Sequence, residues 1–217
     1  MIFDWDGVVV DSTPLHALSW QRMAEQRGTR LPEGLRIGSL GVKTEYVVSD
    51  VLGWATDPEE VARLTQEKEA LYRRLARERG QPSRPGLRRL LEGLTARGIP
   101  CAIGSSALRR NIEECIDALA FRPFFRVIVT GDEVLDGKPA PDIFLEVARR
   151  IEREPNECVV FEDSPAGISA AQAAGMRVIA LLTTNSAAAL LKADRQIHTF
   201  EDLGGSDPLA WFEPVPV

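Results

Sequence analysis

Short apolar runs alternate with amphipathic stretches through the second half of the chain, from about residue 81 onward. Continuous runs rich in valine, isoleucine and alanine are typical of strands that are buried on both faces of a parallel sheet. The predicted strands are residues 99–104, 125–129, 158–161 and 178–182, with residues 1–3 as a short first strand. The predicted helices between them are residues 85–97, 108–119, 141–153 and 165–174. This alternation predicts an α/β fold with a doubly wound, Rossmann-like parallel sheet.

The segment that follows the first strand has a different pattern, with helical periodicity and no strand-like run. A capping hydroxyl followed by proline opens its first helix, and a Gly/Pro-rich stretch ends its last one. The later helices of this segment are predicted at residues 44–52 and 58–79. We therefore predict an α-helical cap domain over residues 12–80, inserted into an α/β core made of residues 1–11 and 81–217.

The composition narrows the class of protein. The chain has 26 lysines and arginines against 32 aspartates and glutamates, a net charge of −6, which disfavours a basic nucleic-acid binder. Its 3 cysteines form no CxxC or Cys/His cluster, so neither a disulfide framework nor a zinc site is indicated. No apolar run reaches the roughly 18 residues that span a bilayer, and no signal peptide is visible. We expect a monomeric cytoplasmic protein without nucleic-acid or membrane partners.

Two aspartates follow the first predicted strand. Asp4 and Asp6 are two residues apart and precede Gly7, so both side chains face the same side of an extended chain. Like charges this close are unfavourable unless a cation or a shared proton compensates them, which favours a functional site. The alternatives are an ordinary acidic turn and part of a calcium loop, although the glycine and glutamate spacing of such a loop is missing.

A second acidic pair, Glu162 and Asp163, follows another predicted strand. The carboxyl ends of parallel strands share one edge of the sheet, so these carboxylates can converge with Asp4 and Asp6. Four hard oxygen donors without histidine or cysteine suit Mg²⁺. The sequence therefore predicts a magnesium site formed by Asp4, Asp6, Glu162 and Asp163.

Two further segments carry groups that can bind a phosphate. Ser105 and Ser106 follow the second predicted strand with hydroxyl groups, and Lys138 lies in a loop before a helix. Taken singly, each is more often an ordinary turn serine or a solvated lysine. Together, and in this order along the sheet edge, they favour a phosphoryl site.

These segments resemble the four sequence motifs of the haloacid dehalogenase superfamily. The motifs are Asp4-x-Asp6-Gly7, Ser105, Lys138-Pro139-x-Pro141-Asp142 and Glu162-Asp163-Ser164-x-x-Gly167. The opening Asp-Gly-Val-Val-Val-Asp-Ser, with His16 and Trp20 behind it, is similar to the subgroup of β-phosphoglucomutases and small sugar-phosphate phosphatases. The resemblance covers essentially the whole chain, including the helical cap.

The resemblance implies a two-step phosphoryl transfer. Asp4 would be the nucleophile that forms an aspartyl-phosphate, and Asp6 would be the general acid and base. Mg²⁺ would be held by Asp4, Asp163 and the backbone carbonyl of Asp6, with Glu162 ligating or orienting. The residues expected to hold the phosphoryl oxygens are Ser105, Ser106 and Lys138. Because a halide leaves without a proton, the presence of Asp6 favours phosphate chemistry over dehalogenation.

Substrate specificity is expected to lie in the cap. The mutases carry a Lys-Gly-Val-Ser-Arg type loop whose cations hold a second phosphate, whereas this chain reads Leu40-Gly41-Val42-Lys43-Thr44. Lys68 matches a cap lysine shared by phosphatases and mutases, with a solvated helix lysine as the alternative. His16 could bridge cap and core or be a packing residue, and Arg109 could face the substrate or belong to an ordinary helix start. The candidate cap and substrate contacts are His16, Lys43, Thr44, Lys68 and Arg109.

We therefore expect a Mg²⁺-dependent phosphatase that acts on a small phosphorylated metabolite, a sugar phosphate. A mutase of the β-phosphoglucomutase type is the alternative enzyme. From a different class, a non-enzymatic phospho-receiver module also accepts phosphate on an aspartate at a strand end. Such a module needs neither Asp6 as an acid nor an inserted cap.

Overall fold

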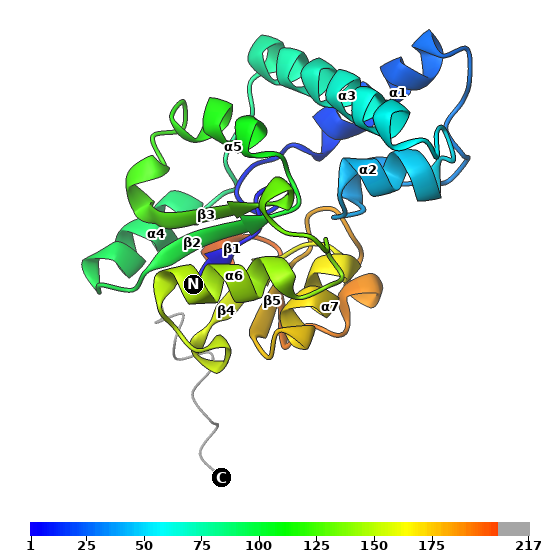
Figure 1. Cartoon of the computed structure of the whole chain (residues 1–217). Coiled ribbons are helices and arrows are strands. Elements are labelled where there is room, and N and C mark those ends of the chain that lie inside the picture. Colours follow the sequence, from blue (N-terminus) through cyan, green and yellow to red (C-terminus); the bar gives the residue numbers. More distant parts are fainter. Residues whose placement is uncertain (204–217) are drawn as a thin grey trace.

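The computed structural model describes residues 1–203 and contains a six-stranded parallel sheet in the order β3-β2-β1-β4-β5-β6 (Figure 1). The strands are β1 (Ile2–Phe3), β2 (Cys101–Ser105), β3 (Phe125–Thr130), β4 (Val159–Glu162), β5 (Arg177–Leu181) and β6 (Arg195–Ile197). The doubly wound fold is thus confirmed, with the short first strand at its centre. The predicted core segment extends to residue 217, and its last part, residues 204–217, lies outside the described residues.

Helices cover both faces of the sheet (Figure 1). On one face lie α4 (Leu87–Ala96) and α5 (Arg109–Ile116), and on the other lie α6 (Asp142–Ile151) and α7 (Pro165–Ala173). Successive strand side chains alternate between these two layers, so Phe3 packs with the first and Ile2 with the second. Burial on both faces explains why these strands appear in the sequence as continuous apolar runs.

Short helical segments complete the described part of the chain. The 3₁₀ turns are η1 (Ile37–Ser39), η3 (Arg122–Phe124), η4 (Gly131–Glu133), η5 (Pro155–Glu157), η6 (Ala187–Leu190) and η7 (Phe200–Leu203), and η2 (Val47–Val51) is a π-helical turn. η7 contributes buried Phe200 and Leu203 to the face that α4 and α5 cover.

The segment between β1 and α4 is helical and forms a separate lobe (Figure 1). Its helices are α1 (Thr13–Gln26), α2 (Thr44–Tyr46) and α3 (Pro58–Arg79). Asp57 caps α3, because its Oδ1 accepts a hydrogen bond from the backbone N–H of Glu60 at 3.0 Å. Buried Trp20 and Leu64 belong to an apolar cluster made entirely within this lobe. The predicted helix over residues 44–52 is present as α2 followed by the π-helical turn η2. The limits of the cap domain at residues 12 and 80 stay a prediction.

Two chain segments connect this lobe to the sheet, and they are hydrogen-bonded to each other. The backbone N–H of Asp11 donates to the carbonyl of Pro82 at 2.9 Å, and that of Arg84 donates to the carbonyl of Val9 at 3.0 Å. The resulting antiparallel bridge lies directly after the loop that carries Asp6. It fixes the place where the cap leaves the sheet edge.

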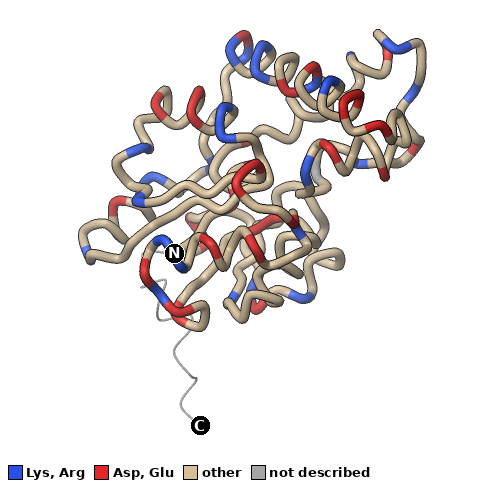
Figure 2. Tube along the Cα trace, viewed as in Figure 1, with Lys and Arg blue, Asp and Glu red and all other residues tan. Residues whose placement is uncertain are grey.

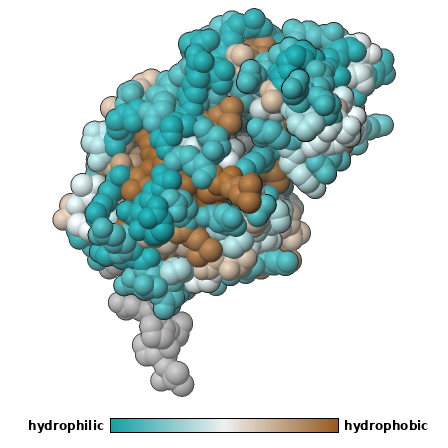
Figure 3. Space-filling view, viewed as in Figure 1, coloured by the Kyte–Doolittle hydropathy of each residue, from teal (hydrophilic) through white to brown (hydrophobic). Residues whose placement is uncertain are grey.

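Charged and apolar side chains are interspersed on the surface. Acidic and basic positions are both spread over the two lobes in the described part of the chain (Figure 2), and hydrophilic residues surround apolar patches on the face seen in Figure 3. Within the described residues, no helix combines the length and the apolar character that crossing a membrane requires.

Candidate active site

A pocket lies between the cap and the carboxyl ends of β1, β2 and β4. Its polar lining residues include Asp4, Asp6, His16, Thr44, Lys68, Glu69, Ser105, Ser106, Asn111 and Asp163. The parallel sheet therefore brings the predicted strand-end residues to one edge, as its topology requires. Glu69 and Asn111 are additions that the sequence did not single out.

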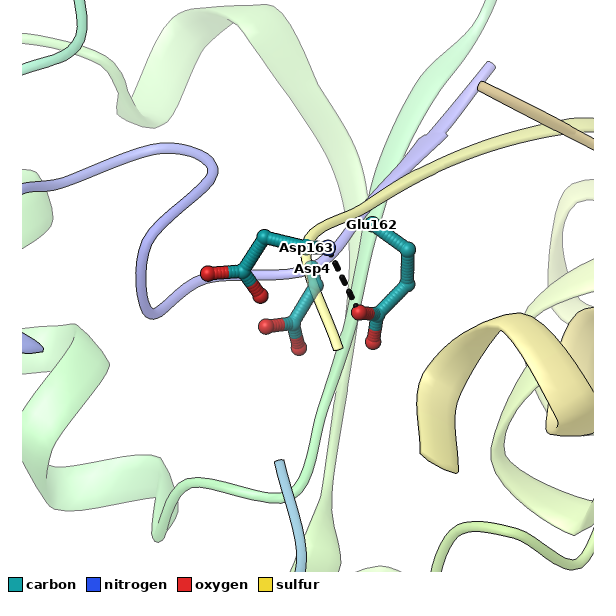
Figure 4. Close-up of side chains that lie close together, drawn as sticks. All are labelled: Asp4, Glu162 and Asp163. Atoms are coloured by element: carbon teal, nitrogen blue, oxygen red, sulfur yellow. Dashed lines mark hydrogen bonds between the residues drawn. The ribbon is translucent and has the colours of Figure 1, made fainter. Parts of the chain in front are cut away.

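Three buried carboxylates, Asp4, Glu162 and Asp163, meet at this edge. One oxygen from each lies within 4.8 Å of the others, and Figure 4 shows the three side chains gathered where β1 and β4 end. Burial raises the pKa of Asp4 to about 7; the attraction of Lys138 opposes this shift, and repulsion by Glu162 and Asp6 adds to it. Burial, together with repulsion by Glu162 and Asp4, also raises the pKa of Asp163 well above its usual value. The raised pKa values show that burial and mutual repulsion disfavour full ionisation of these carboxyl groups.

Lys138 supplies one positive charge to this cluster. Its Nζ donates to Oδ1 of Asp4 at 2.8 Å and to Oε1 of Glu162 at 2.7 Å. The ammonium also lies 4.8 Å from the centroid of the Phe144 ring. Burial alone would lower the pKa of Lys138, but the two carboxylates outweigh it and raise that pKa. Lys138 is therefore a buried, paired cation, and the alternative of a solvated lysine is wrong.

Glu162 accepts from main-chain N–H groups and from the Ser164 hydroxyl, and Asp163 accepts from threonine hydroxyls. Oε2 of Glu162 accepts the backbone N–H groups of Asp163 at 2.7 Å and Ser164 at 2.8 Å. Oδ2 of Asp163 accepts the hydroxyl groups of Thr184 at 2.5 Å and Thr183 at 3.4 Å. Glu162 is consequently fixed by the main chain at the start of α7, whereas Asp163 lines the pocket.

The chemistry of this donor set fits a divalent cation. Three carboxylates against one lysine leave an excess of negative charge in a buried place, and carboxylate oxygens are the ligands that Mg²⁺ prefers. Asp4 and Asp163 both reach the pocket and could hold the ion there. The carboxylate of Asp6, which the sequence expects to converge with them, does not join this cluster.

The Asp6 carboxylate points toward the cap. Its Oδ1 accepts the hydroxyl of Ser12 at 2.6 Å and lies 3.1 Å from Nε2 of His16. Burial would raise the pKa of Asp6, but the charge and hydrogen bond of His16, with help from Ser12 and Lys68, hold it below its usual value. The pKa of Asp4 is therefore raised and that of Asp6 lowered, although both aspartates line one pocket.

Gly7 allows the chain to turn directly after the two aspartates. Its φ of +78° lies in the left-handed region, and a Cβ at this position would lie 1.9 Å from Oδ2 of Asp163. The backbone of the first motif thus passes close to the carboxylate of the last one. Trp5, between the aspartates, is fully buried in the sheet's apolar core.

The two predicted phosphate-binding serines have different partners. Ser105 is buried at the end of β2, and its Oγ accepts the backbone N–H of Ala107 at 3.3 Å. Its own O–H remains able to donate to a ligand. Ser106 instead donates to the carbonyl of Gly41 at 3.0 Å, which joins the core to the cap loop.

Hydroxyl residues after β5 form a further part of the site that the sequence interpretation missed. Thr184 bonds to the side chain of Asp163, and Thr183 donates to the carbonyl of Gly7 at 2.9 Å. Asn185 donates to the carbonyl of Asp163 at 2.9 Å. A polar run at the end of a core strand is the signal that could have revealed them.

The cap contributes a buried polar network to the pocket. Nζ of Lys68 lies 2.8 Å from Nδ1 of His16 and donates to Oε1 of Glu69 at 2.7 Å. Thr44 donates to the same Glu69 oxygen at 2.6 Å. The His16 ring stacks on Tyr72 with centroids 3.9 Å apart. Because only 2% of Lys68 is exposed, the alternative of a solvated helix lysine is wrong.

The family model that matches the chain describes a haloacid dehalogenase-like hydrolase, and it covers residues 1–175. The chain belongs to this family of hydrolases. The phosphorylated carbohydrates phosphatase of Thermotoga maritima is 34% identical to this hydrolase over 199 residues, 89% of this chain and 90% of that protein. The beta-phosphoglucomutase of Bacillus subtilis is 30% identical over 211 residues, 94% of this chain and 90% of that protein.

Solved structures agree with this membership. A HAD hydrolase of family IA, variant 3, from Entamoeba histolytica is 29% identical, with a TM-score of 0.87 and 98% of each chain covered. The chain spans only 54% of another phosphatase that it matches. The predicted resemblance to the subgroup of β-phosphoglucomutases and phosphatases is confirmed, and so is the enzyme class.

Two of the residues expected to contact substrate lie elsewhere in this hydrolase. Nζ of Lys43 donates to the carbonyls of Val134 at 2.8 Å and Leu135 at 3.1 Å, in the loop before Lys138. Arg109 donates to the carbonyl of Ile128 at 2.7 Å, and it also pairs with acidic side chains on η4 and α5. Neither side chain lines the pocket.

Proposed function

We propose that this hydrolase is a Mg²⁺-dependent phosphatase that releases phosphate from a small sugar phosphate through an aspartyl-phosphate on Asp4. The observation that supports it best is the different placement of Asp4 and Asp6 in one pocket. Asp4 lies beside Lys138 and Asp163, while Asp6 is held by His16 and Ser12. This geometry supports a role for one carboxylate beside the transferred phosphate and for the other in exchanging a proton.

In the first step, a carboxylate oxygen of Asp4 attacks phosphorus, and the bond between phosphorus and the sugar oxygen breaks. Asp6 donates its proton to that leaving oxygen. The bound phosphate lies in the same pocket and raises the pKa of Asp6 by repulsion, so that the carboxyl can carry the proton. Lys138 and Ser105 donate hydrogen bonds to the phosphoryl oxygens.

In the second step, Asp6 takes a proton from water, and the water oxygen attacks phosphorus. The bond between phosphorus and Asp4 breaks, which releases inorganic phosphate and restores the free carboxylate. His16 keeps the Asp6 carboxylate oriented between the two steps. Bound Mg²⁺, held by Asp4, Asp163 and the backbone carbonyl of Asp6, would supply positive charge beside the phosphoryl oxygens.

The test is steady-state release of phosphate from a panel of sugar phosphates in the presence of Mg²⁺. Asp4→Asn should lose all measurable turnover, and Asp6→Asn should lose about 10²-fold to 10⁴-fold, the usual contribution of a general acid. Asp50→Asn, the same change at an exposed position of the cap, is the matched control. Turnover that persists in Asp4→Asn would contradict the mechanism.

A phosphosugar mutase is the second candidate, because a beta-phosphoglucomutase is 30% identical over nearly the whole chain. The cap loop argues for the phosphatase: Lys43 is bound to main-chain carbonyls and Thr44 to Glu69. The two enzymes are separated by incubation with β-glucose 1-phosphate and a catalytic amount of glucose 1,6-bisphosphate. Conversion to glucose 6-phosphate without net release of phosphate would overturn our choice.

A further inference from the structure

A buried carboxylate, Glu69, forms part of the cap side of the pocket, opposite the carboxylates of the sheet edge. Only 3% of Glu69 is exposed. Its Oε1 accepts hydrogen bonds from Lys68 at 2.7 Å and Thr44 at 2.6 Å, and its Oε2 accepts one from Nδ2 of Asn111 at 2.5 Å. Glu69 therefore joins two helices of the cap to α5 of the core.

Lys68, the lysine that lines this region, already has an anionic partner. Burial would raise the pKa of Glu69, but Lys68, His16 and Thr44 lower it to about 2, so Glu69 is ionised and neutralises Lys68. The next acidic group, Asp6, is paired with His16. A second anionic group on a substrate would meet no unpaired cation among the residues that line the pocket, and it would lie beside two carboxylates.

The remaining surface of this region suits a neutral, hydroxyl-bearing molecule. Thr44, Asn111 and Glu69 provide donors and acceptors, which can exchange hydrogen bonds with hydroxyl groups. Apolar side chains of the cap complete the wall. They are Trp20, Ile37, Leu40, Val42 and Val47.

We propose that Glu69 is a specificity-determining residue that restricts the substrate to a monophosphate whose leaving group is neutral and polyhydroxylated. The proposal rests on the proposed phosphatase function, since it assumes that the transferred phosphate lies beside Asp4. A second phosphate would have to leave water for a site in which Glu69 repels it. Such a like-charge contact should weaken binding by more than about tenfold.

The first experiment measures binding without turnover. Isothermal titration of Asp4→Asn protein in Mg²⁺ compares fructose 1-phosphate with fructose 1,6-bisphosphate, two ligands that differ in the second phosphate. We expect the monophosphate to bind at least about tenfold more tightly. Equal or tighter binding of the bisphosphate would overturn the proposal, and this comparison needs no change at Glu69.

The second experiment changes the charge of Glu69. Adding Glu69→Gln to Asp4→Asn should reduce the difference in affinity between the two ligands by about tenfold, because the charge of Lys68 is then uncompensated. Glu67→Gln, two residues away on the exposed side of α3, is the matched control and should leave this difference in affinity unchanged. A difference in affinity that is the same in Glu69→Gln and Glu67→Gln would contradict the role of Glu69.

The same ligands separate this proposal from the phosphatase function. If the wild-type protein binds the monophosphate preferentially but releases no phosphate from it, the proposed function fails and the specificity assigned to Glu69 stands. If phosphate is released equally fast from both compounds at low concentration, the phosphatase stands and the specificity proposal fails.

Discussion

Lys138 partly neutralises the acidic cluster at the sheet edge. Its single ammonium contacts Asp4 and Glu162, while a third carboxylate, Asp163, lies in the same cluster. Exposed ion pairs such as Arg63 with Glu60 contribute little to stability, because water already solvates both groups. A buried pair behaves differently, since removing one partner leaves the other without solvent. Loss of Lys138 should therefore cost more stability than loss of an exposed arginine such as Arg63.

Gly41, in the cap loop, lies close to Ser164 of the core. Its φ is +72°, and a Cβ there would lie 2.2 Å from Oγ of Ser164. Rotation of the Ser164 hydroxyl does not remove the clash, because the Cβ of Ser164 would also lie 2.6 Å away, so we expect the cap loop to move away from the sheet edge and open the pocket to water. We expect Gly41→Ala to lower kcat/KM by about tenfold or more, as is usual when reacting groups are no longer held together.

Gly53→Ala is the control for this prediction. Gly53 has a similar φ of +60°, but a Cβ added there would have no atom within 4 Å outside its chain neighbours. Both variants should lower the free energy of unfolding by about 1 kcal/mol, the effect of placing alanine in the left-handed region. Urea unfolding and steady-state kinetics check both parts; equal losses of kcat/KM would show that the cap loop is not responsible.

At the scale of elements, the sequence predicts the strands and helices whose apolar residues form a clear run or a clear period. The buried strands and the amphipathic helices of the core follow from their apolar runs. β6 (Arg195–Ile197) is absent from the prediction, because a three-residue edge strand with two polar residues has no such run. Thr183 and Thr184 are missed because hydroxyl residues after a strand are also ordinary turn residues.

The cap shows a different limit of sequence interpretation. An acidic residue next to a lysine on a long helix is normally solvated, so the sequence gives no reason to single out Glu69. Its burial depends on α3 packing against α1 and α5, a tertiary contact that helical periodicity does not contain. The core motifs could be placed because they end strands of one parallel sheet. The roles of Lys43 and Arg109 could not, since a long side chain reaches several neighbours from one backbone position.

The contact between the cap loop and the loop before Lys138 depends on Lys43. Its ammonium donates to two main-chain carbonyls, of Val134 and Leu135. A hydrogen bond that involves a charged group is worth about 1.5 kcal/mol or more, which is about a factor of ten in the closing equilibrium of the cap. Because this hydrogen bond is lost, we expect Lys43→Met to lower kcat/KM about tenfold, with a small change in the free energy of unfolding.

Lys192→Met is the matched control for this prediction, because Lys192 is exposed and is not among the residues that line the pocket. Phosphate-release kinetics and thermal unfolding of both variants provide the measurement. A kcat/KM for Lys43→Met that equals that of Lys192→Met would show that this contact does not control closure.

At the scale of the whole molecule, the acidic cluster links stability to pH and to metal. Burial raises the pKa of Asp4 from 3.8 to about 7, so the folded protein takes up a proton between these values that the unfolded chain does not. Without metal, the free energy of unfolding should therefore increase by about 2 kcal/mol as the pH falls from about 8 to about 5. A bound cation compensates the same charge, so Mg²⁺ should stabilise the protein most at the higher pH.

Urea unfolding at several pH values, with EDTA or with Mg²⁺, measures this dependence. Asp4→Asn is the control, because it removes one of the two carboxyl groups with a raised pKa and should make the pH profile in EDTA less steep. A metal-free stability that does not change between the two pH values would contradict the charge balance described for the cluster.

The central position of β1 connects catalysis to the completion of folding. Ile2 and Phe3 pair with β2 on one side and β4 on the other, and both partners come much later in the chain. Contacts between distant segments form slowly, because a long loop must close first. A chain still being synthesised therefore carries Asp4 without the lysine and the aspartate that complete its surroundings. On the proposed mechanism, phosphoryl transfer therefore requires the completed sheet.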